Sequence, residues 1–297
     1  MTWRVTKCWM VFVASLLAYG TAVAGPWVLA PREFSSEVRG STFSSETFYD
    51  DDGLRPNLAH GGTYESRTMR WSSELGWKKR ASFRIDIPFE SVTRRFDSPA
   101  FELTRTGFSD LLLGLNVRIL DGPTALSAEI GWKAPTGYNK DLAVLTLGDG
   151  RQDGIGFIHY GTAIKSLAAF VQAGAGYRMR LESYGNAYDQ TLMTADVGRW
   201  FGPSLLISGS YRGRFDVDPV VAGADPAFTS SNGKSTQHVL GPEIRYRVDD
   251  HLDIFAGSLH SVSGQNALHV DQLFVGVTTK KTQLNRLQGF IGNKSNP

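Results

Sequence analysis

Apolar and polar residues alternate strictly along several stretches of this chain. In "ASFRIDIPFE" (residues 81–90), Phe83, Ile85, Ile87 and Phe89 are apolar, and most of the residues between them are charged. Successive side chains of a β-strand point to opposite faces, so this stretch predicts a strand with one apolar and one ionic face. Such a strand suits a soluble sheet with a packed core, or a membrane barrel whose apolar face meets lipid.

The same two-residue period recurs in further segments, each bracketed by turn residues. The clearest are 68–77, 109–119, 125–133, 169–180, 204–216 and 242–248. The period is weaker in 33–49, 153–166, 191–201, 251–262 and 268–279, which we also expect to form strands. No helical period is visible, so the pattern predicts an all-β chain of about twelve strands.

The connections between these segments alternate between short and long. Short ones such as "LDGPT" and "VDDH" carry turn residues, and longer polar stretches such as "DSPAFELTRT" (97–106) lie between them. Outer-membrane barrels have tight periplasmic turns and longer extracellular loops, whereas a soluble sandwich has no reason to sort its connections by length. We therefore predict a single transmembrane antiparallel β-barrel of about 12 strands, with a periplasmic sheet protein as the alternative. Trp77, Trp132, Trp200 and Tyr211, near strand ends, would suit interfacial aromatic girdles.

The first residues have the layout of a secretory signal peptide. Arg4 and Lys7 precede an apolar stretch, and the small residues Ala22-Val23-Ala24 precede Gly25. We expect a signal peptide over 1–24, an outer-membrane β-barrel over 25–280 and a C-terminal tail over 281–297. These expectations place the protein in the outer membrane of a Gram-negative bacterium.

Composition narrows the choice of partners. Cleavage would remove two of the 31 basic residues and none of the 29 acidic ones, which leaves no net charge and no support for nucleic-acid binding. Past the leader, the apolar runs are too short for a transmembrane helix, so only a closed barrel could cross a membrane. Expected partners are outer-membrane lipid and a small-molecule solute, with the oligomeric state left open.

Residues that carry enzymatic chemistry are sparse. The only cysteine lies in the leader, no G-x-S-x-G motif is present, and the histidines are not at metal-ligand spacing. An outer-membrane lipid-modifying esterase is the sharpest enzymatic alternative, because a twelve-stranded outer-membrane phospholipase has a His-x-Ser pair on one strand face. Here Ser258-x-His260 has the right parity but the reverse order. We therefore expect no catalytic residues, no metal site and no cofactor.

The polar faces of the predicted strands assign charged residues to the barrel lumen. The basic ones are Arg70, Arg84, Arg118, Lys133, Arg178, Arg180, Arg212, Arg214, Arg245 and Arg247. The acidic ones are Glu74, Asp86, Glu90, Asp110, Glu129, Asp196, Asp216 and Glu243. We expect the pore lining to include Arg70, Arg84, Asp86, Arg118, Glu129, Lys133, Arg178, Arg180, Arg212, Arg214, Glu243 and Arg245.

This charge distribution allows two interpretations. A basic ladder along a channel would attract anionic solutes, whereas near-balanced charges could pair across a narrow barrel and close it. If the lumen is open, we expect Arg178, Arg180, Arg212 and Arg214, assigned to adjoining strands, to set selectivity.

Several Gly-rich motifs carry a family resemblance. They are "TGFSDLLLGLNVRIL", "GWKAPTGYN", "GDGRQDGIGFIHYG" and "GAGYRMR" over about 107–180, and the later "AGSLHSVSGQNA". In these motifs the chain resembles the outer-membrane transporter family named after the meta pathway of phenol degradation, over about half of its mature length. The resemblance implies a β-barrel that passes small, often hydrophobic or aromatic compounds, and it carries over no catalytic residues.

These observations together predict an outer-membrane channel or transporter for small molecules. The rivals are a structural or adhesive barrel without an open pore, and the lipid-modifying esterase. We expect residues 138–152 to fold inward as a constriction. The chain lacks the terminal aromatic residue that usually closes such barrels, so either the last strand ends near Thr279 or the strand count is wrong there. A C-terminal tail or residues 25–31 could then plug the pore.

Overall fold

The protein is an almost purely β structure. The computed structural model describes residues 25–58, 61–97, 99–136, 145, 147–148, 150–181, 188–217 and 234–281. Its strands are β1 (Phe34–Ser45), β2 (Phe48–Tyr49), β3 (Tyr64–Lys78), β4 (Ala81–Asp97), β5 (Ala100–Phe108), β6 (Leu111–Leu120), β7 (Thr124–Ala134), β8 (Asp153–Ile164), β9 (Ala169–Arg180), β10 (Asp189–Phe201), β11 (Leu205–Val217), β12 (Thr236–Arg247), β13 (Leu252–Gln265), β14 (Ala267–Leu268) and β15 (Asp271–Lys281). Across these described ranges, no helix is long and apolar enough to span a membrane.

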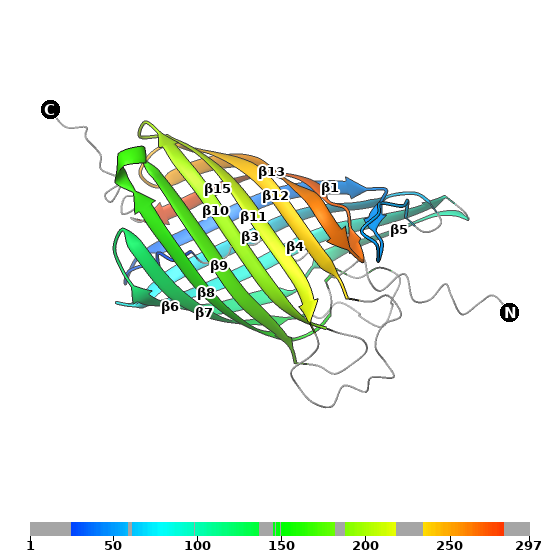
Figure 1. Ribbon diagram of the computed structural model, residues 1–297, viewed down its shortest axis with the longest axis horizontal. Helices are drawn as coiled ribbons and strands as arrows, with labels where there is room; N and C mark the ends of the chain where they lie inside the picture. Colours follow the sequence, from blue (N-terminus) through cyan, green and yellow to red (C-terminus); the bar gives the residue numbers. More distant parts are fainter. Residues whose placement is uncertain are drawn as a thin grey trace.

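The main sheet closes on itself as an antiparallel barrel (Figure 1). Neighbouring strands pair in order from β6 to β13, β15 pairs with both β13 and β1, and β3 links β1 to β4. β5 and β6 both pair with β4, at residues 89–97 and 81–86 respectively, so they continue each other as one interrupted strand. The wall therefore has twelve strands, which confirms the predicted fold and the less regular strands.

The predicted long connection over residues 97–106 is wrong, because most of it forms β5. This strand pairs with β4 alone among the described strands, and the β4–β5 hairpin projects from the end that carries the long loops (Figure 1). Cross-strand polar pairs hold it: Arg95 Nε donates to Glu102 at 2.8 Å, and the hydroxyls of Thr93 and Thr104 lie 2.9 Å apart. Such pairs stabilise a sheet even where both faces meet water.

Alternate side chains separate into an apolar outer face and a polar inner face. Phe83 and Phe89 of β4 are exposed on the outside, whereas Arg84, Asp86 and Glu90 of the same strand are buried inside. The other strands follow the same rule, with outer residues such as Ile130, Val197, Ile244 and Val275 exposed. This distribution is that of a barrel surrounded by lipid.

One of the predicted girdle residues points the other way. Trp77 and Trp132 are exposed on the outer face, but Trp200 is buried and packs inside against Ala163 and Leu206. The guanidinium of Arg247 lies 5.0 Å from the Trp200 ring. The prediction failed because Phe201, the next residue along β10, takes the outer position at this strand end.

The lipid-facing assignment can be tested with a charge placed at two depths on β15. Val275, in the middle of the strand, is expected to cost about 2–4 kcal/mol of unfolding free energy when changed to arginine. Thr279 also faces outward but lies near the short-turn end, where the same change should cost about 0–1 kcal/mol. Urea unfolding of both variants in lipid vesicles measures the difference, and equal costs would contradict the assignment.

Candidate functional site

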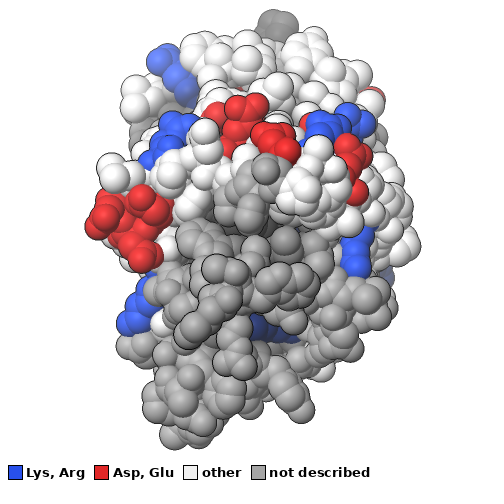
Figure 2. All heavy atoms as spheres, turned by 90° about the vertical axis from the view of Figure 1, so that its right-hand side faces the viewer, with Lys and Arg blue, Asp and Glu red and all other residues white. Residues whose placement is uncertain are grey.

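The predicted pore-lining residues lie on the inner face of the wall. Eight of the twelve are buried, and the side chains of Arg180, Arg212, Glu243 and Arg245 are at most 20% exposed. Seen from the long-loop end, acidic and basic side chains lie next to one another along the upper part of the rim (Figure 2). The inner face of the barrel therefore carries both acidic and basic side chains.

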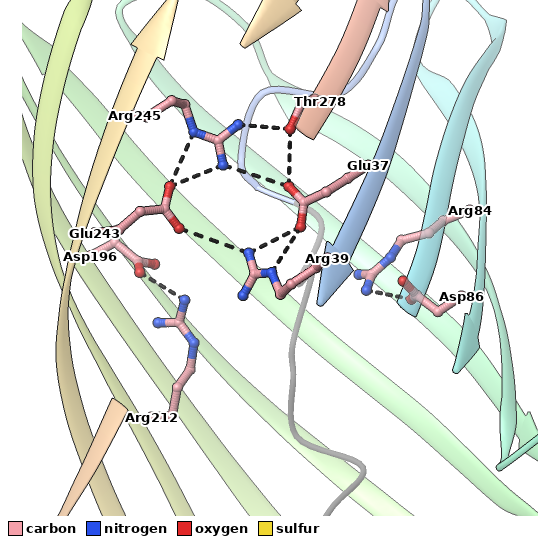
Figure 3. Close-up of polar contacts among 9 residues, drawn as sticks. All are labelled: Glu37, Arg39, Arg84, Asp86, Asp196, Arg212, Glu243, Arg245 and Thr278. Atoms are coloured by element: carbon pink, nitrogen blue, oxygen red, sulfur yellow. Dashed lines mark hydrogen bonds and ion pairs between the residues drawn. The ribbon is translucent and has the colours of Figure 1, made fainter. Parts of the chain in front are cut away.

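One network of ion pairs runs along the inner face of the wall between β1 and β12 (Figure 3). Arg245 of β12 lies 3.0 Å from Glu243 and 3.5 Å from Glu37 of β1. Arg39 completes a ring of four ion-paired residues, because it lies 3.0 Å from Glu37 and 3.8 Å from Glu243. Thr278 of β15 receives a hydrogen bond from Arg245 at 2.9 Å and donates one to Glu37 at 3.2 Å. Two cations and two anions thus balance each other beside the β1–β15 pairing.

Aromatic rings support this network from the wall. The guanidinium groups of Arg39 and Arg245 lie 5.0 and 4.4 Å from the ring of Phe255, and Arg39 also lies 4.6 Å from Phe274. The Phe255 ring can lie flat because its neighbour on β15 is Gly276, where an added Cβ would stand 2.3 Å from the ring. Cation–π contacts in a desolvated place stabilise by about 2 kcal/mol, so the rings fix both arginines.

A second network surrounds Asp153, which is completely buried at the start of β8. Arg180 binds both of its oxygens, at 2.9 and 2.8 Å, and Lys133 lies at 2.9 Å. Lys133 also reaches Asp110 at 3.0 Å, and Arg178 stands 3.8 Å from Asp153. Three strands, β7, β8 and β9, are thereby joined through one carboxylate, and Lys133 extends the network to Asp110 just before β6.

A third network lies on β4, β7 and β8. Arg84 pairs with Asp86 at 2.5 Å and with Glu129 at 3.5 Å, and His159 lies 3.3 Å from the other oxygen of Glu129. Near it, neither carboxylate oxygen of the buried Glu90 has a hydrogen-bond partner in the described structure. Among the residues that the structure describes, no group of three or more His, Cys, Asp or Glu is placed to hold a metal ion.

The arginines expected to set selectivity are not on adjoining strands. Arg178 and Arg180 lie on β9, Arg212 and Arg214 lie on β11, and β10 separates them. The prediction missed this separation because β10 was among the weakly alternating segments. The strand between supplies Asp196, which accepts from Arg212 at 2.8 Å, and Gln190, which accepts from Arg178 at 3.2 Å.

Residues 25–33 run inside the barrel rather than in its wall. Asn116 and Ser127 donate to the carbonyl of Gly25 at 3.4 and 3.3 Å, and Arg118 donates to the carbonyl of Val28. The indole of Trp27 donates to Gly122 at 3.2 Å. These partners lie toward the end of the barrel that carries the short turns, where the segment lies against the inner face of the wall.

Close packing at Gly76 holds the same segment. The amide of Gly76 on β3 donates to the Glu33 carbonyl at 2.9 Å, and the amide of Arg32 donates to the Gly76 carbonyl at 3.3 Å. An added Cβ at Gly76 would stand 1.8 Å from the Ala30 carbonyl, so only glycine allows this approach.

The opposite end of the lumen is lined by apolar residues. Phe43, Tyr64 and Val92 point inward from the wall strands and pack with Leu145, Leu147 and Leu268. Most of the predicted inward loop 138–152 lies outside the described residues, but Leu145 and Leu147 are buried in this cluster. The inner face is thus partly apolar at one end, carries ionic networks along its length and contacts residues 25–33 at the other end.

Several inner-face residues escaped the sequence-based assignment. They are Glu37, Arg39, Asp153, His159, Asp189, Asp253, Thr278 and Lys280. Most lie on strands whose alternation is weak, where parity alone gives no face. The signal that could have found them is their charge within segments already expected to be strands.

Comparison with known proteins agrees with the fold. No protein-family model and no curated protein sequence matches the chain. Among solved structures, it is similar to the COG4313 outer membrane channel from Pseudomonas putida F1, at 11% identity and a TM-score of 0.68, over 88% of this chain and 100% of that one. It is also similar to the NanC porin, at 11% identity and a TM-score of 0.51, over 83% and 100%. The chain has the fold of an outer-membrane β-barrel.

The Asp153 network offers a test of how much the inner charges stabilise the wall. Changing Asp153 to asparagine removes the carboxylate that the buried Arg180 and Lys133 share, and leaves Lys133 with Asp110; the change should cost about 3–5 kcal/mol of unfolding free energy. Changing Arg95 to glutamine breaks two ion pairs on the exposed hairpin, where water screens the charges, and should lower the free energy of unfolding far less. Urea unfolding compares the two variants, and equal losses would show that the buried network stabilises the wall no more than exposed pairs do.

Proposed function

We propose that this protein is an outer-membrane channel for small molecules whose lumen is closed at rest by residues 25–33. The observation that carries the proposal is the polar inner face, since a barrel that served only as a scaffold could fill its interior with apolar side chains. The similarity to proteins described as an outer membrane channel and as a porin supports this assignment.

The plug is attached in a way that suits release. Residues 25–33 contact the wall through side-chain hydrogen bonds from β6 and β7 and through two backbone hydrogen bonds to Gly76 of β3. Each such bond contributes about 0.5–1.5 kcal/mol net, so displacement of the segment costs far less than opening the wall. A lumen closed by a detachable segment implies a passage that opens.

The lining favours solutes that are partly apolar and partly anionic. The apolar cluster of Phe43, Tyr64, Leu145 and Leu147 would be met first from the long-loop end, which we place at the cell surface. The inner face also carries positive charge, from Arg180 at the end of β9 and from Arg212 within β11. Small aromatic acids combine both properties, which agrees with the resemblance to a family linked to phenol degradation.

Single-channel recording in planar bilayers tests the plug. The intact chain should conduct weakly, and removal of residues 25–31 should raise the conductance at least twofold, because the lumen near Asn116 and Ser127 is then free. Gly76→Ala should act in the same direction, since its Cβ displaces Ala30. Gly40→Ala is the matched control, because a Cβ at Gly40 meets nothing within 4 Å. Bilayers that stay sealed with all four proteins would overturn the channel and favour a structural or adhesive barrel.

Ion selectivity tests the arginines of β9. Changing Arg178 and Arg180 to serine removes two positive charges beside Asp153, so the unplugged channel should shift its preference from anions toward cations. The reversal potential across a potassium chloride gradient measures this shift. The same double change at Arg95 and Arg199, which are both exposed, should leave it unmoved. A reversal potential that is the same in both double variants would exclude the β9 arginines from the conducting path.

A further inference from the structure

Three polar residues interrupt the apolar outer face on neighbouring strands. Ser258 and His260 of β13 share the outer face with Ile254 and Val262, because they are spaced by two residues along the strand. Asp271, the first residue of β15, stands directly opposite His260 in the strand register. Ionisable groups on a wall that faces lipid are costly and often serve a function.

The three side chains form a continuous hydrogen-bonded chain. Ser258 Oγ lies 2.9 Å from His260 Nε2, and His260 Nδ1 lies 2.9 Å from Asp271 Oδ1. A carboxylate only accepts, so Nδ1 carries the proton and donates to Asp271, and Nε2 is free to accept the serine proton. This order of hydroxyl, imidazole and carboxylate is that of a nucleophile, its general base and the group that orients the base.

The surroundings keep Asp271 directed at His260. His269 Nδ1 lies 3.7 Å from the other oxygen of Asp271, but Arg55, 3.1 Å away, can only donate to that nitrogen. Burial lowers the pKa of His269, and the nearby Arg55 lowers it further, so this histidine is neutral at neutral pH. His269 therefore does not compete as a hydrogen-bond donor for Asp271.

The place of Ser258 on the outer wall determines which substrates could reach it. His260 and Asp271 are half exposed, and the outward neighbours across the strands are Leu240 and Leu273. Asp271 is the first residue of β15, so these residues lie at the edge of the apolar wall nearer the long loops. A substrate would be an ester that is held in the membrane by its acyl chain, with the chain lying on the apolar wall.

We propose that Ser258, His260 and Asp271 form a hydrolytic site for long-chain acyl esters of membrane lipids on the outer wall. Ser258 Oγ attacks the ester carbonyl carbon while His260 Nε2 takes its proton. The bond to the lipid alkoxide then breaks, and His260 returns the proton to the leaving alcohol. Water, deprotonated by His260, then attacks the acyl carbon; the bond from that carbon to Ser258 Oγ breaks, His260 returns the proton to Oγ, and a fatty acid is released. Ser258 and His260 are catalytic residues, and Asp271 is a positioning residue; none of the three touches the lumen.

The nucleophile is tested with a fluorophosphonate probe on the folded chain in detergent micelles. Ser258 should displace fluoride and become labelled. Ser258→Ala should abolish labelling and His260→Gln should slow it on the order of a hundredfold. Ser263→Ala is the matched control, because Ser263 is an exposed serine on the same strand. Heat-dependent migration on gels shows that each variant is folded. An unlabelled native protein, or labelling that survives Ser258→Ala, would overturn the proposal.

The positioning role of Asp271 and the substrate need separate readouts. Asp271→Asn should slow labelling and move the midpoint of its pH dependence to lower pH, since the carboxylate no longer stabilises the imidazolium; a merely structural change would leave the midpoint in place. Fatty-acid release is then measured from phosphatidylethanolamine micelles and from lipopolysaccharide, and the more active arm identifies the lipid. Release that is equal in the Ser258→Ala variant, or absent from both lipids, would rule out the hydrolase. Unaltered conductance in Ser258→Ala keeps this result separate from the channel.

Discussion

Every backbone amide of a wall surrounded by lipid must find its partner within the protein, and the closed sheet follows from that requirement. Closure depends on β1, which pairs with β15 on one side and with β3 on the other. Once the ladder of hydrogen bonds is closed, the two-residue period fixes which side chains point outward and which point into the barrel. Apolar side chains such as Val275 stand outside, and each charged neighbour is sent into the lumen.

Charges that point into the barrel are largely buried, so each needs a partner. In the described structure, most of them form ion pairs with residues of opposite charge on other strands. Asp153, Glu37 and Glu129 each face more than one cationic or histidine partner, and the arginines bridge strands that are distant in sequence. Arg118 instead donates to the backbone carbonyl of Val28, so residues 25–33 also help to compensate a buried charge of the wall. Buried charges of this kind favour one arrangement mainly because a charge left without its partner is so costly.

Strand number, strand faces and the inner charges could be read from the sequence because period and parity are local properties. Register is not local. The sequence alone does not tell that β10 separates Arg180 from Arg212, or that Asp271 stands opposite His260. β5 was read as a loop because its cross-strand partners on β4 lie outside the segment itself. Trp200 was placed on the wrong face because parity at a strand end depends on where the strand meets its turn. The ion pairs and the path of residues 25–33 likewise depend on contacts between distant segments.

The ring of Glu37, Arg39, Glu243 and Arg245 also has a consequence in time. β1 is the first strand of the barrel and β15 the last, so the contact between them cannot form until the whole chain is in place. The ring and Thr278 lie beside that contact and join its two sides, which makes them a latch on the final seam. Residues 25–33 directly precede β1, so the segment that lies inside the barrel is joined without a break to the strand that makes this final contact.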